Sequence, residues 1–248
     1  MNITTVDFMG LRLARITVRE FISEIMYAAK ARSPLLTTYL NAHCSNIAAR
    51  ADEYRRILES ADLLYADGKA VVWASRLLNS PIPERVSAGD FFIEFCNVCA
   101  EQRIHVYLLG SYPEVAERVS AFLGSHVPNL RIAGVRHGFI APADEQAVIS
   151  GINSSGADIL IVGMGVPLQE KFVARHRDAL EPPVIWCVGA LFEYVGGYRK
   201  RAPVWVRKIG MEWFVRLALE PRRLWKRYIL GNPRFVARVL KYTLRRGK

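Results

Sequence analysis

The sequence predicts an α/β fold: a Rossmann-like parallel sheet covered by helices, with a basic helical appendage at the C-terminal end. Three observations predict it. Short apolar runs alternate with longer helical patterns over the first two-thirds of the chain, the order expected of a parallel sheet with crossover helices. Of the 248 residues, 51% are hydrophobic, so the chain can bury a full core. The third observation is the uneven distribution of charge.

Positive charge is concentrated at the C-terminal end. Residues 199–248 contain 16 Lys and Arg against 2 acidic residues, whereas residues 1–198 contain 18 basic and 21 acidic residues. A basic segment of this kind indicates a polyanionic partner, such as anionic lipid, a diphosphate or nucleic acid. We therefore expect a core over residues 1–198 and an appendage over residues 199–248 that contacts membrane and substrate.

Each apolar run of the core is expected to be a strand that leads through a loop into a helix. The strands are expected at residues 34–40, 62–66, 104–109, 130–135, 157–164 and 183–188. The helices are expected at residues 18–31, 43–59, 69–78, 90–102, 113–123, 143–154 and 168–180. Pro113 and Pro167 fit the first turns of two of these helices, with acidic residues close behind them.

The appendage shows two helical patterns. The first has an apolar and aromatic stripe at four-residue spacing, formed by Trp205, Ile209, Trp213 and Leu217. The tripeptide Gly231-Asn232-Pro233 is expected to interrupt the helix. The second pattern has a basic stripe beside an apolar one, formed by Arg234, Arg238, Lys241 and Arg245 and by Phe235, Val239 and Tyr242. It is typical of a helix lying on an anionic membrane surface, and a helix docked on its own core is the alternative.

The location of the protein follows from its apolar segments. None approaches the roughly 20 residues that a membrane-spanning helix needs. The first residues lack the basic start and sustained apolar segment of a secretory signal. We therefore expect a peripheral protein at the cytoplasmic face of the membrane.

Ligands of a parallel α/β sheet bind beyond the carboxyl ends of the strands, so the residues after each strand are candidate contacts. Most are glycine or polar, as close approach of the backbone to a ligand requires. The candidates chosen on this ground are Asn41, Asp67, Gly110, His137, Gly163 and Gly165. Gln169, at the mouth of the following helix, can both donate to and accept from a sugar hydroxyl. Tight turns at the glycines and an ordinary loop role for His137 are the alternatives.

Asp67 is the candidate for chemistry. It stands directly after an apolar run and before Gly68, where a carboxylate can take the proton of an attacking hydroxyl group as a general base. Asp is also favoured as a helix N-cap. The sequence alone leaves both roles open.

The sequence indicates no metal site. It contains no Asp-x-Asp, and its five histidines form no metal-spaced cluster. The pair Cys96-Asn-Val-Cys99 lies in an apolar helical pattern without a second pair of ligands. Arginines are abundant, and guanidinium groups bind phosphate oxygens in pairs. We expect arginine, with no metal or other cofactor, to neutralise phosphate charge.

Several longer motifs occur in a fixed order along the chain. They are Ala66-Asp67-Gly68, Leu108-Leu109-Gly110, His137-Gly138-Phe139, Gly163-Met164-Gly165-Val166-Pro167-Leu168-Gln169-Glu170, Arg201-Ala202-Pro203 and Glu212-Trp213-Phe214-Val215-Arg216-Leu217. In these motifs the chain resembles the WecG/TagA/CpsF family of bacterial glycosyltransferases, from about Leu35 to Phe235.

The resemblance implies an inverting enzyme that moves a sugar from a UDP-sugar to a polyprenyl-diphosphate-linked saccharide in surface polysaccharide biosynthesis. It implies that Asp67 is the general base and that Arg85 and Gln169 bind or position substrate. Arg216 and Arg223 are the best matches to family arginines that close over the diphosphate. The resemblance further implies chemistry without a metal, membrane association through the appendage and a core able to form homo-oligomers.

Two departures from the family pattern concern the donor sugar. Tyr39-Leu40-Asn41 replaces the usual Thr-x-Asn, with Thr38 displaced by one position, and Phe192-Glu193 replaces the usual Phe-Asp. Glu193 is therefore a further candidate substrate contact. We favour a hexose donor, UDP-glucose, for exopolysaccharide assembly, with UDP-N-acetylmannosamine or its uronic acid as alternatives.

Two other classes share parts of the pattern. A dinucleotide- or S-adenosylmethionine-dependent enzyme has the same alternating order, but the chain lacks Gly-x-Gly-x-x-Gly after an early strand. A nucleic-acid-binding protein would explain the basic segment. The aromatic stripe with Trp205 and Trp213 fits lipid or core better than nucleic acid, so we expect no nucleic-acid partner.

Overall fold

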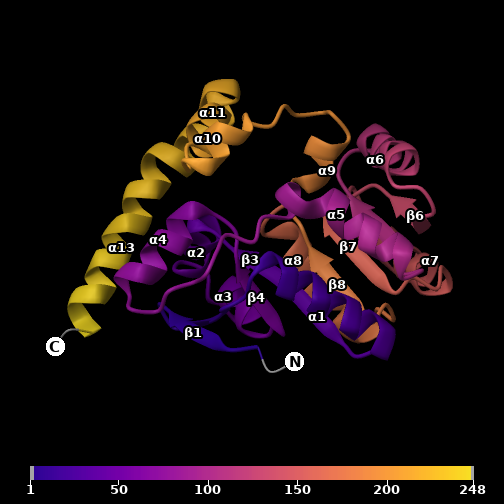
Figure 1. Ribbon diagram of the computed structural model, residues 1–248, viewed down its shortest axis with the longest axis horizontal. Coiled ribbons are helices and arrows are strands. Elements are labelled where there is room, and N and C mark those ends of the chain that lie inside the picture. The colour runs from indigo at the N-terminus through magenta and orange to yellow at the C-terminus, as the bar shows by residue number, and fades with distance from the viewer. Residues whose placement is uncertain (1–2, 247–248) are drawn as a thin grey trace.

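The six predicted strands form one sheet in the computed structural model, which describes residues 3–246. They are β3 (Leu35–Leu40), β4 (Leu63–Ala66), β5 (His105–Gly110), β6 (Arg131–Arg136), β7 (Ile159–Gly163) and β8 (Val184–Cys187). The order is β4-β3-β8-β7-β5-β6, and every pair is parallel. The predicted α/β class is confirmed (Figure 1).

Helices cover both faces of the sheet, which is why β3 and β7 are buried at every position. One face packs against α1 (Val18–Ala31), α5 (Ala88–Glu101) and α6 (Pro113–His126). The other packs against α7 (Glu145–Ser154) and α8 (Leu168–His176). Successive side chains of β7 point to opposite faces of the sheet. Ile161 packs on the side of α1, α5 and α6, and Leu160 packs on the side of α7 and α8.

Aromatic side chains fill the centre of the first face. The Trp186 ring on β8 is fully buried and lies 4.7 Å from the Phe95 ring and 5.4 Å from the Phe21 ring, between centroids. Its indole N–H donates to the Tyr65 hydroxyl at 3.0 Å, so the one polar atom of the ring is satisfied. These contacts join α1 and α5 to the sheet beneath the site.

Two parts of the core differ from the sequence prediction. Residues 5–14 form an unpredicted hairpin of β1 (Thr5–Phe8) and β2 (Leu11–Ala14), with Met9 and Gly10 both at positive φ in its two-residue turn. The single helix expected at residues 43–59 is two helices, α2 (Ala42–Ala48) and α3 (Asp52–Glu59). The break is at Ala51, the N-cap of α3, whose backbone is extended with φ −129° and ψ 99°.

The C-terminal segment runs through α9 (Leu191–Val195), α10 (Val204–Lys208), α11 (Glu212–Leu219), α12 (Pro221–Trp225), a π-helical turn (Lys226–Leu230) and α13 (Gly231–Arg246). Two predictions for it are wrong. The stripe expected on one helix is divided between α10 and α11, because Gly210 turns the chain at a φ of +82°. The helix continues through Gly231-Asn232-Pro233: the π-helical turn Lys226–Leu230 runs directly into α13, and the Gly231 N–H donates to the Lys226 carbonyl.

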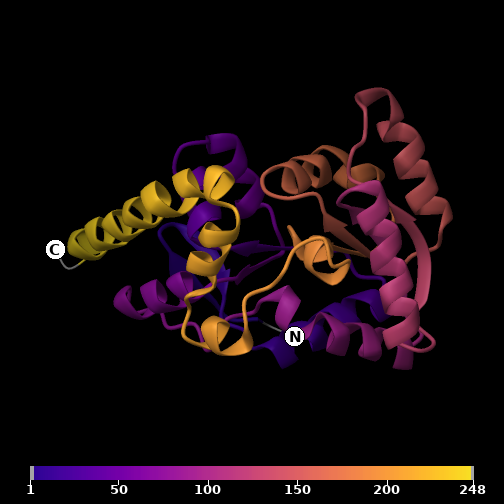
Figure 2. The same cartoon turned by 90° about the horizontal axis from the view of Figure 1, so that it is seen from above.

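Helix α13 packs on the protein, at the end of the sheet opposite β6 (Figures 1 and 2). Phe235 and Val239 are each 2% exposed, and the Phe235 ring stacks near Phe8. Arg238 donates to the Ser45 carbonyl at 2.8 Å and to Asn46 Oδ1 at 2.9 Å on α2. The apolar stripe of α13 is therefore docked on the core of the protein. The expectation that Arg238 faces lipid is wrong.

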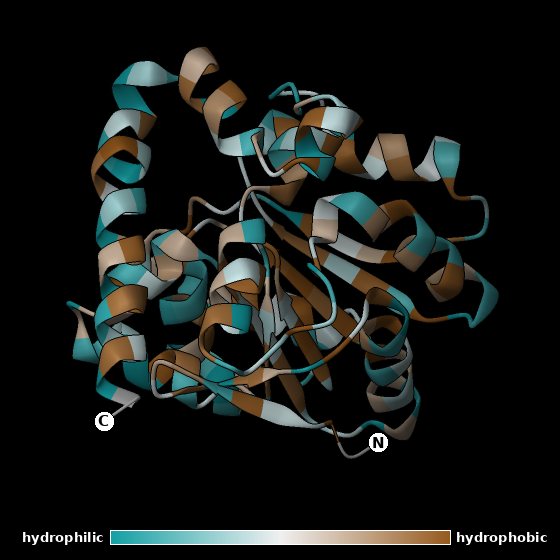
Figure 3. Cartoon of the chain, turned by 60° about the vertical axis from the view of Figure 1, so that its left-hand side comes forward, coloured by the Kyte–Doolittle hydropathy of each residue, from teal (hydrophilic) through white to brown (hydrophobic). Residues whose placement is uncertain are grey.

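Two sets of side chains on α13 are exposed. One is basic, Arg234, Lys241 and Arg245, and the other is apolar, Val236, Leu240 and Leu244. Figure 3 shows this mixture of hydrophilic and hydrophobic residues along the helix. Within residues 3–246, no helix has both the length and the apolar character to cross a membrane.

Candidate active site

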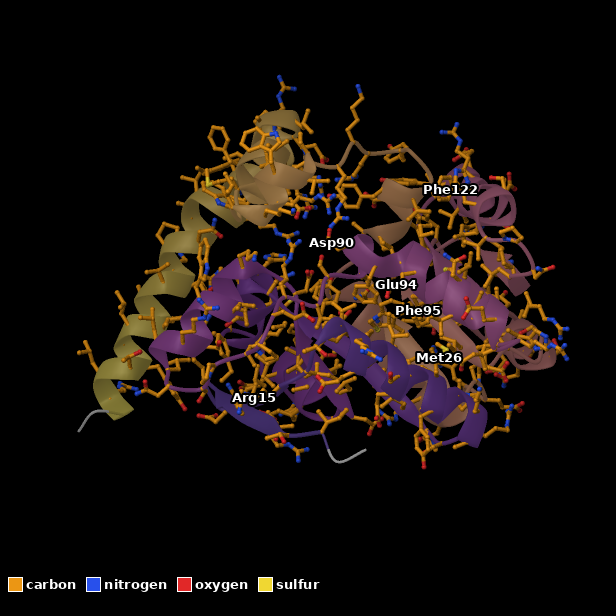
Figure 4. The ribbon with its side chains drawn as sticks, in the orientation of Figure 1. Arg15, Met26, Asp90, Glu94, Phe95 and Phe122 are labelled. Atoms are coloured by element: carbon orange, nitrogen blue, oxygen red, sulfur yellow. The ribbon has the colours of Figure 1, made fainter. Side chains whose placement is uncertain are left out.

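One cavity of about 740 Å³ lies at the carboxyl ends of the strands, between the sheet and the C-terminal segment. The sequence-predicted residues that line it are Asn41, Asp67, Arg85, Gly165, Glu193, Arg216 and Arg223. Others that line it were not singled out as site residues, namely His43, Lys69, Arg201, Glu212 and Arg227. The cavity thus joins residues from the first and last quarters of the chain. Figure 4 shows Asp90 at the start of α5, beneath the C-terminal segment that completes this site.

Asp67 is held at the floor of the cavity. Its backbone N–H donates to the Leu40 carbonyl at 2.9 Å, which fixes it beside the end of β3. Gly68, at a φ of +131°, then turns the chain into α4 (Lys69–Leu77). The N-cap of α4 is Gly68 and no side chain caps it, so Asp67 is not the helix cap that its sequence position allowed.

The environment of the Asp67 carboxyl favours proton uptake. Burial raises its pKa above the ordinary value for aspartate, while the Arg85 cation and a hydrogen bond with Ser87 oppose that rise. The side chain is partly exposed to the cavity. The carboxyl can therefore meet a ligand hydroxyl and take its proton.

An ion-pair network joins the floor of the cavity to the C-terminal segment. Asp90 pairs with Arg85 and Arg207, and with Arg201 at 3.0 Å between Oδ1 and Nη2. Glu212 on α11 accepts from Arg85 Nη1 at 3.3 Å. The network binds α10 and α11 to α5, and these acids partly neutralise Arg85 and Arg201 before any ligand binds.

Arg216 and Arg227 have a different environment. The Nε atom of each is buried and has no hydrogen-bond partner within residues 3–246. Burial and the two nearby cations lower the pKa of His43 to about 4, so this imidazole is neutral at pH 7. Two partly buried arginines, each with an Nε that has no partner among the described residues, form a site suited to a diphosphate.

Arg223 and Glu193 belong to a chain of ion pairs at the rim. Arg223 donates Nε to Glu220 Oε2 at 2.7 Å and Nη2 to Oε1 at 2.9 Å. Glu220 also accepts from Arg199 at 2.6 Å, and Arg199 pairs with Glu193. Burial raises the pKa of Glu193, and the Arg199 cation opposes this rise. Both candidates line the cavity, but their charges are already paired.

Gln169 does not reach the cavity. It is fully buried, its Oε1 accepts from the Gly189 N–H at 2.8 Å, and its Nε2 donates to Glu170 at 2.7 Å. Thr38 also donates to Glu170, at 3.2 Å. Gln169 therefore shapes the Gly189 loop, which does line the cavity, and its direct contact with sugar hydroxyls stays a prediction.

Gly110, Gly163 and His137 also lie outside this cavity. A Cβ on Gly110 would be 2.4 Å from the Gly163 carbonyl carbon, and one on Gly163 would be 2.7 Å from the Phe192 ring. These glycines are required by close packing between elements, and their contact with a ligand stays a prediction. His137 is partly buried, with no hydrogen-bond partner for Nδ1 among the described residues.

Replacing Glu170 with Gln should stabilise the protein more at high pH than at low pH. Burial raises the pKa of Glu170 from 4.5 to about 7, against hydrogen bonds from Gln169 and Thr38. The stability that protonated Glu170 contributes to the folded state is therefore fully present below about pH 4.5, and it is lost as the pH rises to about 7. We compare how much Glu170→Gln changes the free energy of unfolding at pH 8 and at pH 4. We expect the change at pH 8 to be more stabilising than the change at pH 4 by about 2 to 3 kcal/mol. Urea titrations at both values measure this, with the exposed Glu94→Gln as control. An equal effect at both pH values would contradict the assignment.

Comparison with known proteins agrees with the geometry. Residues 6–248 match the model of the glycosyl transferase WecG/TagA/CpsF family. An N-acetylglucosaminyldiphosphoundecaprenol N-acetyl-beta-D-mannosaminyltransferase from Bacillus subtilis (strain 168) is 33% identical over 202 residues, 82% of this chain and 77% of the relative. A protein of the same name from Staphylococcus aureus (strain NCTC 8325 / PS 47) is 29% identical over 242 residues, 97% of this chain and 94% of the relative. The chain is a glycosyltransferase and belongs to the WecG/TagA/CpsF family.

Proposed function

We propose that the protein transfers a sugar, with inversion, from a UDP-sugar to a saccharide linked through diphosphate to a polyprenol. The observation that carries the proposal is the placement of the Asp67 carboxyl and the uncommitted guanidinium groups of Arg216 and Arg227 in one cavity. A base and a diphosphate site on the same cavity are what this transfer needs.

The reaction follows from these groups. Asp67 takes the proton of the acceptor hydroxyl as its oxygen attacks the anomeric carbon of the donor. The bond from that carbon to the diphosphate oxygen breaks on the opposite face, and UDP leaves with the electron pair. Arg216 and Arg227 stabilise the negative charge that develops on the diphosphate. Arg85 and Arg201 add positive charge nearby, reduced by Asp90 and Glu212.

The relatives favour a different donor from the glucose that we expected from the sequence. Both are named for transfer of N-acetylmannosamine to N-acetylglucosaminyldiphosphoundecaprenol. We therefore propose UDP-N-acetylmannosamine as the donor and an N-acetylglucosaminyl-diphosphate lipid as the acceptor. Neither name supports exopolysaccharide assembly specifically.

Turnover with a panel of donors tests the proposal. The full-length protein is incubated with an N-acetylglucosaminyl-diphosphate lipid in detergent and with UDP-N-acetylmannosamine, its uronic acid or UDP-glucose, and UDP release and glycolipid product are measured. We expect transfer with UDP-N-acetylmannosamine at a kcat/KM at least about tenfold above that with UDP-glucose, because a site that binds a polar substituent rejects the analogue that lacks it. Absence of transfer with every donor would refute the reaction, and a preference for UDP-glucose would refute the donor.

We also propose that the C-terminal segment contacts the membrane surface. Trp205 on α10, Ile209 directly after α10 and Phe214 on α11 are 67%, 55% and 54% exposed. Exposed aromatic and aliphatic side chains beside Arg and Lys are typical of protein surfaces that bind anionic membranes. The surface formed by these three residues is the proposed contact.

The double variant Trp205→Ser/Ile209→Ser should sediment less with vesicles that contain anionic lipid. Loss of two exposed apolar side chains removes buried area in the membrane-bound state, and we expect at least a fivefold lower fraction bound. The exposed Tyr27→Ser on α1 is the control, because Tyr27 is 61% exposed on another part of the protein. Equal binding by the double variant and the control would refute this contact.

A further inference from the structure

We infer that the apolar groove between α4 and α13 holds the isoprenoid units of the acceptor that lie next to its diphosphate. The inference rests on the proposed function for the identity of the acceptor, and it adds a place for the lipid chain. It concerns a part of the cavity that the chemistry of Asp67 and the arginines does not use.

Two helices form the groove. Trp73 and Leu77 lie one turn apart on α4 and are 52% and 58% exposed. Val236 and Leu240 lie one turn apart on α13 and are 53% and 51% exposed. The two helices are neighbours in the fold, and all four side chains line the cavity that contains Asp67. Apolar surface thus lines both sides of the groove.

The chemical character changes along the cavity. Near the sheet, the lining includes Asp67, Arg85, Arg201 and Glu212. Lys69 at the start of α4 and Asn232 at the start of α13 are the only polar residues that these two helices contribute to the lining among the described residues. The others are apolar, namely Ala70, Trp73, Ala74, Leu77, Phe235, Val236, Val239 and Leu240. One end therefore suits sugar and diphosphate, and the other suits hydrocarbon.

The polar and apolar parts belong to one cavity, and this indicates what the groove holds. The acceptor carries its saccharide on one side of its diphosphate and its polyprenyl chain on the other. With the saccharide at Asp67, the chain must leave the cavity away from that residue, and the groove is the apolar part of the same cavity. Leu244, 73% exposed one turn after Leu240, extends the apolar row along α13. A peptide or a second copy of the protein would not need an apolar groove that continues into a site for sugar and diphosphate.

The test compares two acceptors that share the N-acetylglucosaminyl-diphosphate group, one with a long polyprenyl chain and one with a short alkyl chain. The double variant Leu77→Asn/Leu240→Asn places polar groups in the groove. We expect its ratio of kcat/KM for the long acceptor to kcat/KM for the short acceptor to fall about tenfold relative to the unmodified protein. The matched control is Leu219→Asn/Ile229→Asn, since both residues are more than half exposed and lie outside the cavity. Its ratio should not change.

The inference would be overturned if Leu77→Asn/Leu240→Asn left the ratio of kcat/KM for the long acceptor to kcat/KM for the short acceptor unchanged. It would also be overturned if Leu219→Asn/Ile229→Asn lowered this ratio equally. If the groove variant also lost vesicle binding in parallel with the ratio, the surface would contact bulk membrane and not one chain, which would again overturn it.

Cross-linking separates this inference from the proposed reaction. A polyprenyl-diphosphate-N-acetylglucosamine with a benzophenone on its first isoprene units is photolysed with the full-length protein in the absence of donor, and labelled peptides are mapped by mass spectrometry. Labels on α4 and α13 support the groove even if no sugar transfer is found with any donor. Labels confined to other elements overturn it even if transfer occurs.

Discussion

Replacing Asp67 with Asn is expected to lower kcat by about 10²- to 10⁴-fold, the usual contribution of a general base. Asparagine keeps the size of the side chain and can still accept from Ser87, but it cannot take a proton. Binding of UDP, measured by calorimetry, should change less than about threefold, because the diphosphate is expected at Arg216 and Arg227. Asp178→Asn removes the same charge from an exposed position and is the control. Wild-type turnover by Asp67→Asn would exclude Asp67 as the base.

The pH profile gives a second measurement on the same residue. A base must be ionised to act, so kcat/KM should fall as the pH is lowered through the pKa of Asp67. Burial raises that pKa above the ordinary aspartate value, and Arg85 opposes the rise. Arg85→Gln should therefore move the acidic limb to higher pH. Movement to lower pH would contradict this electrostatic account.

Arg216→Gln and Arg227→Gln should each lower kcat by about 100-fold, within the range measured when one preorganised donor to a developing negative charge is removed. Both guanidinium groups have a buried Nε without a partner in the described part of the chain, so neither is committed to a structural ion pair through that atom. Arg216→Lys should recover little activity, because an ammonium group cannot form the paired contact of a guanidinium.

Arg222→Gln is the matched control for these variants. Arg222 is exposed on α12, on the same segment, and does not line the cavity. Thermal unfolding of all three variants should remain close to that of the unmodified protein. A loss of kcat in Arg222→Gln equal to that in the other two would show that total charge, and not placement in the cavity, is what matters.

Strand positions and part of the candidate site could be predicted from the sequence, because each depends on a single physical rule. Strands buried on both faces are short, largely apolar runs, which is why β3, β4, β7 and β8 could be predicted. The edge strand β6 is only partly buried, and its place in the alternation of strands and helices predicted it. The carboxyl-edge rule also placed Asn41 and Asp67 beside a cavity that the structure contains. Positions of this kind depend on local pattern and sheet direction alone.

The sequence could not predict what depends on partners from distant parts of the chain. Gln169 has the chemistry of a sugar contact, but Gly189 and Glu170 occupy its hydrogen bonds. Gly110 is where a ligand could approach, but the Gly163 backbone approaches instead. Conversely, Arg227 is one arginine among many in the sequence, and its importance comes from burial without a partner.

The docking of α13 on α2 changes what a truncated protein would be. Arg238 is bound to α2, which has Asn41 as its N-cap and His43 in its first turn, and the Phe235 ring stacks near Phe8. Removing the chain after residue 198 would delete Arg216 and Arg227 and would uncover apolar surface on α2 and β1. Such a fragment would keep its sheet and its general base but would lack its phosphate site. An inactive fragment would therefore be no evidence that the membrane is needed for catalysis.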